Sequence, residues 1–111
     1  MNIQRDKAAT FAQLHRSDGA FNIPNPWDIG SARVLEALGF ESLATTSSGF
    51  ANTIGRVDGQ ITLEEKLAHC ASLCSATTLA ISADLEQCFA DDPSGVAATI
   101  SKVDEVGIVG A

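Results

Sequence analysis

The chain has 111 residues, a length typical of one domain with its own hydrophobic core. Hydrophobic residues make up 45% and charged residues 19% of it, a globular composition that excludes collagen-like and disordered classes. The formal net charge of -7 disfavours nucleic acid as a partner, because an acidic surface repels phosphate groups.

The sequence also lacks membrane and export signals. No run approaches the roughly 18 consecutive apolar residues of a membrane span, so we expect no membrane partner. The N-terminal stretch lacks the apolar core of a secretory signal. Cys70, Cys74 and Cys88 form an odd set without the spacing of a disulfide framework, which is typical of reduced thiols. We therefore expect a cytoplasmic protein.

Helical and strand-like segments alternate along the chain. In chain order, periodicity and capping signals predict a helix from 3 to about 16, a strand at 20–24, a helix at 28–38, a strand at 42–46, a helix starting at 62, a strand at 79–84, a helix at 92–107 and a strand at 108–111. Because successive strands are joined by helices, the pattern predicts the α/β class with a parallel sheet.

The helix starts carry specific signals. Asp28 is a suitable N-cap, Thr62 and Glu65 have the spacing of a capping box, and Asp92 precedes a first-turn Pro93. We expect the last helix to bury three apolar side chains: Val96, Ile100 and Val103.

The helix that starts at residue 62 shows two faces. Its apolar face comprises Leu63, Leu67, Cys70, Ala71 and Cys74, and its polar face comprises Thr62, Glu65, His69 and Ser72. A zinc site of His69 with the three cysteines is an alternative interpretation. The apolar series favours the cysteines as small core residues instead.

Two architectures fit the four predicted strands. One is a complete open sheet, and the other is the first half of an eight-stranded barrel of the TIM type. In both cases we expect residues 1–111 to form a single domain. Periodicity alone does not decide between them.

Polar groups follow the predicted strands, where parallel α/β folds form their sites. Asp84 and Glu86 form an acidic pair without a nearby basic residue, and such carboxylates suit Mg²⁺. For an isolated pair, a solvated acidic turn is the commoner interpretation. Residues 47–49 can present hydroxyl and backbone N–H groups to an anion, or form a simple turn. Nucleotide-binding and serine-hydrolase motifs are missing.

Four motifs in register carry a family resemblance. Residues 25–33 (NPWDIGSAR), 43–51 (LATTSSGFA), 55–59 (GRVDG) and 82–86 (SADLE) resemble, in this order and spacing, the isocitrate lyase/phosphoenolpyruvate mutase superfamily. The match covers nearly the whole chain. It implies the N-terminal half of a TIM-type barrel, with strands 1 to 4.

The resemblance also implies an activity. Enzymes of this superfamily are Mg²⁺-dependent lyases or mutases, with Mn²⁺ as an alternative ion. They act on a 2-oxo acid or a phosphoenolpyruvate-like carboxylate, and they break or form C–C or P–C bonds through an enolate. A homo-oligomer, a tetramer in the full-length family, is implied as well.

Residue roles follow from the motif positions. The substrate-binding positions implied by the resemblance are Trp27, Asp28, Ser48, Gly49 and Phe50. The implied metal-site positions are Asp58, Asp84 and Glu86, with Asp84 as the principal ligand and Glu86 acting through water.

Three departures from the family pattern stand out. Cys88 occupies the place of a usual glycine, so the local turn is expected to differ. A further metal-shell carboxylate and the catalytic cysteine of the lyase branches follow the fourth strand in the family, and none of the three cysteines here matches the latter. The catalytic acid or base is therefore unassigned. A catalytically incompetent fragment and an independent small α/β binding domain are the alternative interpretations.

Overall fold

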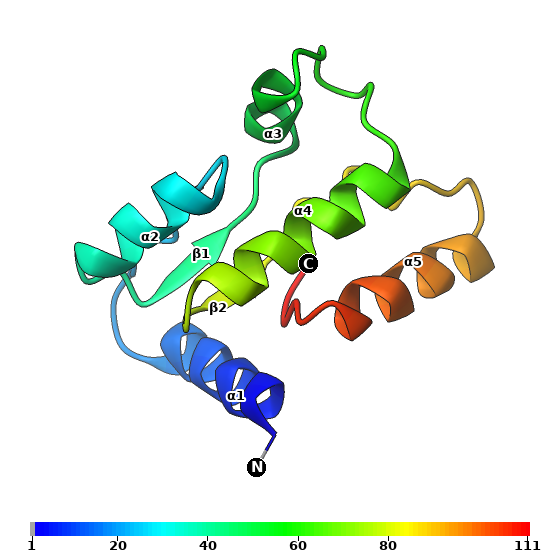
Figure 1. Cartoon of the computed structure of the whole chain (residues 1–111). Coiled ribbons are helices and arrows are strands. Elements are labelled where there is room, and N and C mark those ends of the chain that lie inside the picture. The colour runs from blue at the N-terminus through cyan, green and yellow to red at the C-terminus, as the bar shows by residue number, and fades with distance from the viewer. Residues whose placement is uncertain (1) are drawn as a thin grey trace.

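The computed structural model describes residues 2–111 and is an α/β structure built around a small parallel sheet (Figure 1). Its elements are α1 (Ile3–Arg16), α2 (Ile29–Ala37), β1 (Ser42–Ala44), α3 (Ser47–Thr53), α4 (Leu63–Ala76), β2 (Ala80–Ser82) and α5 (Pro93–Glu105). β1 pairs with β2 in parallel, with Leu43 opposite Ile81. The parallel α/β character agrees with the sequence prediction, although the sheet has two strands and not four.

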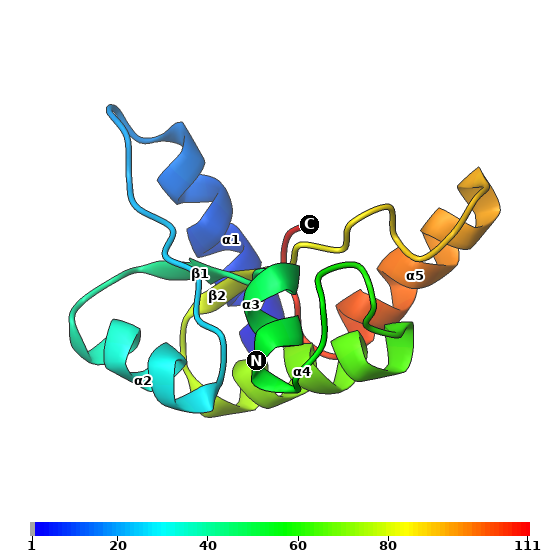
Figure 2. The ribbon, with the colours of Figure 1, turned by 90° about the horizontal axis from the view of Figure 1, so that it is seen from above.

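The main core lies between the sheet and the helices α2, α4 and α5. These helices form a row on one side of the strands, and α1 lies apart from the row and contacts β2 (Figure 2). The core is formed by Ala32, Leu43, Cys70, Leu73, Ile81, Ala83, Leu85, Val103 and Ile108. Among the described residues, none of the helices combines the length and apolar character that a bilayer span requires.

The predicted helix caps are confirmed. The Asp28 carboxylate accepts the Ser31 N–H, and the Thr62–Glu65 capping box is formed in both directions. Asp92 accepts the Gly95 N–H at the start of α5. These contacts involve residues three apart, which is why the local sequence was sufficient to predict them.

The segment 20–24 is extended but is not a strand, contrary to the prediction. The Ala44 N–H donates to the Pro24 carbonyl at 3.1 Å. In a parallel ladder, the Ser42 and Ala44 carbonyls would accept from positions 24 and 26, and both are prolines without an N–H. The Asn25 side-chain amide donates to the Ala44 carbonyl at 2.9 Å in place of the missing backbone donor. The two prolines therefore interrupt the predicted first strand.

The predicted fourth strand is reduced to a single parallel bridge between Ser82 and Gly110. The Ala83 N–H donates to the Gly110 carbonyl at 2.8 Å, and the Val109 N–H donates to the Ile81 carbonyl at 3.0 Å. The segment thus lies beside β2 without forming a regular strand.

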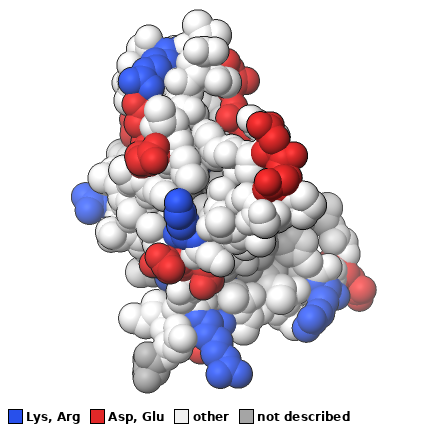
Figure 3. Space-filling view, turned by 90° about the vertical axis from the view of Figure 1, so that its right-hand side faces the viewer, with Lys and Arg blue, Asp and Glu red and all other residues white. Residues whose placement is uncertain are grey.

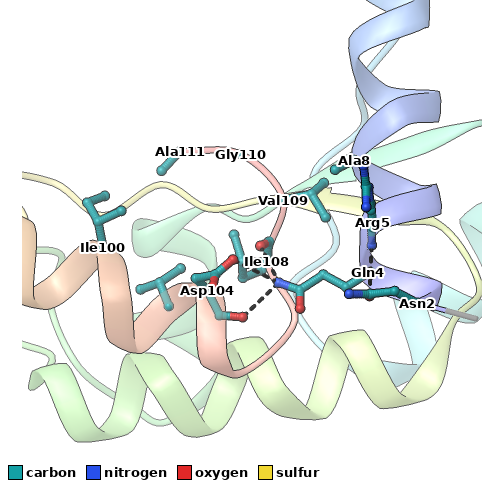
Figure 4. A pocket seen from close by; sticks show the side chains of 11 residues that line it. Asn2, Gln4, Arg5, Ala8, Ile100, Asp104, Ile108, Val109, Gly110 and Ala111 are labelled. Carbon is teal, nitrogen blue, oxygen red and sulfur yellow. Dashed lines mark hydrogen bonds between the residues drawn. The ribbon is translucent and has the colours of Figure 1, made fainter.

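The burial predicted for α5 is only partly correct. Val103 is buried and Val96 is half-buried, but Ile100 is 42% exposed. Ile100 lines an open cavity of about 420 Å³ between α1, α5 and the last residues of the chain (Figure 4). The Gln4 amide spans this region by donating to the Asp104 and Ile108 carbonyls at 2.7 and 3.1 Å.

Asn25→Ala tests the substitute donor at the interrupted strand. The substitution removes the side-chain amide that donates to the Ala44 carbonyl. We therefore expect the free energy of unfolding to fall by about 1 kcal/mol. Urea unfolding followed by circular dichroism measures this change. Asn22→Ala, at an exposed position in the same segment, is the matched control and should change stability by less than about 0.5 kcal/mol. Equal effects of the two substitutions would contradict the assigned role of Asn25.

Candidate active site at the strand ends

Asp84 follows β2 and connects the carboxyl ends of both strands. Its N–H donates to Thr45 Oγ1 at 2.9 Å. Its carboxylate Oδ2 accepts the Ser47 N–H at 3.2 Å, and Oδ1 accepts the Glu86 N–H at 3.0 Å. The Ser47 hydroxyl donates to the Asp84 carbonyl at 3.2 Å. The acidic turn and the segment after β1 therefore form one hydrogen-bonded unit.

The Asp84 carboxylate is exposed and electrostatically favoured as an anion. Partial burial alone would raise the pKa of Asp84. The hydrogen bonds from Glu86 and Ser47 and the nearby Lys66 together lower this pKa below its ordinary value. Asp84 is thus ionised at neutral pH.

The turn after Asp84 has a left-handed backbone. Glu86, Cys88 and Phe89 have φ values of 54°, 61° and 54°. Residues other than glycine rarely adopt a positive φ because their Cβ atom clashes with the backbone, so the turn is strained. The Cys88 carbonyl accepts the Thr99 hydroxyl at 2.7 Å, which ties the turn to α5. The exposed Glu86 is thereby placed beside Asp84.

Residues 47–49, for which the sequence suggests a simple turn or an anion-binding segment, form the start of a helix. Residues Ser47–Thr53 form α3, with Thr46 as the N-cap. Ser48 is exposed, whereas Gly49 is buried against the Trp27 indole. A Cβ atom at Gly49 would lie 2.4 Å from Trp27 Nε1, so only glycine fits there.

Phe50 and Trp27 differ in exposure. Phe50 is buried and stacks on His69, with ring centroids 4.0 Å apart and planes at 11°. Trp27 is 47% exposed, and its carbonyl lies 2.9 Å from His69 Nε2. Of these aromatic groups, the Trp27 indole is the one that a small ligand can reach. Phe50 instead packs α3 against His69 of α4.

Asp28 serves the local fold. Its Oδ1 accepts both the N–H and the hydroxyl of Ser31 at 2.8 Å. These hydrogen bonds lower the pKa of Asp28. The carboxylate therefore caps α2 next to Trp27.

Asp58 lies apart from the other two predicted metal-site residues. It is exposed in the connection between α3 and α4, and no hydrogen bond joins it to Asp84 or Glu86. Within residues 2–111, no group of three or more His, Cys, Asp or Glu side chains is arranged to hold a metal ion. The contact found among these three residues is therefore the one between the Glu86 N–H and the Asp84 carboxylate, and the metal-site assignment stays a prediction.

Cavities and surface charge do not single out this site. The cavity beside Ile100 and a second one of about 620 Å³, between α1 and the start of β2, are lined by other residues than those predicted for the site. On the face shown in Figure 3, basic side chains lie singly and acidic ones in small groups. The candidate site is therefore defined by its hydrogen-bonded geometry.

The burial of His69 and Lys66 on α4 does not follow from the sequence pattern. His69 was placed on the polar face, but it is only 6% exposed, and Lys66 is fully buried. Trp27 and Phe50 contact His69, and Thr45 contacts Lys66, so α4 is buried beyond its apolar stripe. The series Lys66, His69, Leu73 at helical spacing is the signal that could have indicated a second buried face.

His69 is expected to make stability pH-dependent. Burial lowers the pKa of His69 below 6.5, outweighing the opposite effect of the Trp27 carbonyl. Below pH 6.5 the unfolded chain therefore takes up a proton that the folded chain resists, and stability falls until the pH passes the lowered folded pKa. His69→Gln should remove this loss in urea unfolding compared at pH 7.5 and 5.5, whereas the exposed His15→Gln should retain it. An unchanged slope in His69→Gln would refute this assignment.

Cys88→Gly and Cys88→Ala separate backbone strain from side-chain packing. Both remove the half-buried thiol, but only glycine adopts φ near 61° without strain. We expect Cys88→Gly to be more stable than Cys88→Ala by about 1 kcal/mol in thermal or urea unfolding. The control compares Cys74→Gly with Cys74→Ala inside α4. There the alanine variant should be the more stable one, because glycine destabilises a helix interior. Equal stability of the two Cys88 variants would show that the turn is not strained.

Comparisons with known proteins identify the family. The family model for phosphoenolpyruvate phosphomutase matches residues 11–111. A solved protein described as a lyase/mutase from Burkholderia cenocepacia J2315 is 48% identical, with a TM-score of 0.95 over 96% of this chain and 39% of that chain. A protein described as a phosphonomutase from the same organism is 36% identical, with a TM-score of 0.88 over 93% of this chain and 42% of that one.

A third similar structure is oxaloacetate acetylhydrolase in complex with its product oxalate. It is 25% identical, with a TM-score of 0.84 over 95% of this chain and 38% of that one. The chain thus spans less than half the length of each of these proteins. Because the family model matches nearly all of the described residues, the chain belongs to the phosphoenolpyruvate phosphomutase family, within the superfamily that its sequence motifs predict.

Proposed function

We propose that this chain carries metal-binding and carboxylate-binding residues of a lyase or mutase. One observation supports the proposal most directly. The Ser47 N–H donates to the Asp84 carboxylate, so an exposed anion and the segment 47–49 lie together at adjacent strand ends. Parallel α/β folds form their sites at this edge.

Asp84 and Glu86 have the chemistry that a divalent ion requires. Each Asp84 oxygen accepts one N–H, which leaves further lone pairs for a cation. Mg²⁺ and Mn²⁺ take carboxylate oxygens together with water, so two carboxylates are sufficient protein ligands. A bound divalent ion would supply positive charge beside the substrate carbonyl oxygen.

The substrate class follows from the groups beside the metal ligands. The exposed Ser48 hydroxyl and the half-exposed Trp27 indole can contact a small carboxylate, while Gly49 allows the indole to approach the backbone. The likeness to oxaloacetate acetylhydrolase bound to oxalate and to a phosphonomutase supports a 2-oxo acid or a phosphoenolpyruvate-like substrate.

The proposed reaction breaks or forms a C–C or P–C bond next to the carbonyl group, through the enolate of a pyruvate-like fragment. For this reaction Asp84 and Glu86 would hold the divalent ion through their carboxylates, and Ser48 would orient the substrate carboxylate. No acid or base is assigned among these residues. The proposal therefore concerns binding by this chain, and its test is a binding experiment.

Asp84→Asn tests the metal site. Titration calorimetry with Mn²⁺ in the presence of oxalate should show binding to the wild-type chain. Asp84→Asn should weaken it by about 100-fold or more, because even loss of an outer-shell partner costs about 10- to 100-fold. The neutral side chain still accepts one hydrogen bond, so the melting temperature should change by only a few degrees.

Asp18→Asn is the matched control for charge. Asp18 is exposed in the turn after α1, and its neutralisation should leave Mn²⁺ affinity within about twofold, because exposed distant charges are screened. Absence of binding to the wild-type chain, or equal affinity of Asp84→Asn and wild type, would refute the proposed function.

A further inference from the structure

Lys66 is a buried amine without a direct ion pair. It lies in the first turns of α4 and is 0% exposed. The ion pair found among residues 2–111 joins Arg56 and Glu65, so no carboxylate lies within salt-bridge distance of Lys66. Burying an amine without a paired carboxylate destabilises the folded chain unless the amine makes a specific hydrogen bond.

That specific contact is a hydrogen bond to Thr45 at the end of β1. Lys66 Nζ donates to Thr45 Oγ1 at 2.9 Å. The same oxygen accepts the Asp84 N–H at 2.9 Å. One hydroxyl oxygen thus receives a donor from α4 and a donor from the turn after β2, and it has two lone pairs to do so.

The remaining contacts of Asp84 extend this arrangement. Its two carboxylate oxygens accept N–H groups of Ser47 and Glu86. Thr45 is fully enclosed, at 3% exposure, so water does not replace a lost donor there. Burial lowers the pKa of Lys66, while Cys70, Asp84 and Glu86 act in the opposite direction, which places these groups in its electrostatic range.

We propose that Lys66 is a positioning residue of the candidate site. Its amine fixes the Thr45 hydroxyl, and the hydroxyl in turn holds the backbone of Asp84 so that the carboxylate faces the segment after β1. The relevance to metal and carboxylate binding rests on the proposed function, whereas the positioning itself is a property of the hydrogen bonds.

Amide hydrogen exchange measured by NMR tests the positioning directly. Lys66→Met removes the donor and retains an apolar chain, a replacement of a buried charge that folded proteins often tolerate. The amides of Asp84, Ser47 and Glu86 should exchange about tenfold faster, because each depends on the Thr45–Asp84 contacts. The amides of Thr45 and Ala83, which donate to the backbone carbonyls of Ser82 and Gly110, should stay within about twofold of wild type.

Further variants isolate the route through Thr45. Thr45→Val removes the hydroxyl at constant shape and should accelerate the same three amides, whereas Thr45→Ser should not. The double variant with Lys66→Met should match Thr45→Val alone, because the two residues act in series. Lys102→Met, the same substitution at an exposed lysine, should leave all five amides unchanged.

Distinct results would overturn the inference. Unchanged exchange in Lys66→Met would show that Lys66 does not hold the network, and equal acceleration of all five amides would show a general structural role. If Lys66→Met does not fold, equal exchange in Thr45→Val and Thr45→Ser overturns the inference. Mn²⁺ binding in the presence of oxalate separates the two proposals: wild-type chain that binds no Mn²⁺ refutes the proposed function, while the exchange data still decide the role of Lys66.

Discussion

The parallel register of β1 and β2 determines which side chains meet at the candidate site. Ala44 pairs with Ser82, and the Thr45 N–H then donates to the Ser82 carbonyl at 2.9 Å. Adjacent strands are about 4.8 Å apart, so residues that leave the two strands at the same level lie within hydrogen-bond reach. Asp84 meets Thr45 for this reason. A slip of one residue would turn its side chain to the opposite face.

The two prolines before α2 shape the other border of the site. Because positions 24 and 26 lack backbone donors, this segment does not form a regular strand beside β1. Pro26 is buried, and the Asn25 side chain donates to the Ala44 carbonyl. Trp27 then lies across Gly49, and its carbonyl pairs with His69. The loss of a regular strand thereby places an aromatic side chain beside the segment after β1.

Local features of this structure were predictable, and features created by packing were not. Capping residues such as Thr62 and Asp92 act on residues three positions away, so the local sequence determines them. The burial of His69 arises where Trp27 and Phe50 contact α4, and the buried Lys66 contacts Thr45, so both depend on residues distant in sequence. The apolar segment 20–24 is typical of a strand, but Pro24 and the following Pro26 lack the N–H groups that a ladder with β1 requires.

For the candidate site too, local sequence features were predictable and contacts created by packing were not. The position of Asp84 and Glu86 after a strand is visible in the sequence, and in the structure the Glu86 N–H donates to the Asp84 carboxylate. Asp58 was assigned by motif position alone, and it lies in a connection without a contact to them. The supporting groups Thr45 and Lys66 left no motif, because a hydroxyl and an amine act here through hydrogen bonds that only the folded chain creates.

The two carboxylates are held from different parts of the fold. Asp84 is fixed through Thr45 at the end of β1 and through Lys66 on α4. Glu86 belongs to the left-handed turn, whose Cys88 carbonyl accepts the buried Thr99 hydroxyl of α5. A strained turn persists only where surrounding contacts outweigh its cost, so the packing of α5 sets the position of Glu86. Asp84 therefore depends on α4, and the turn that carries Glu86 depends on α5. Under the proposed function, a core substitution between these two helices should alter cation affinity without changing either carboxylate.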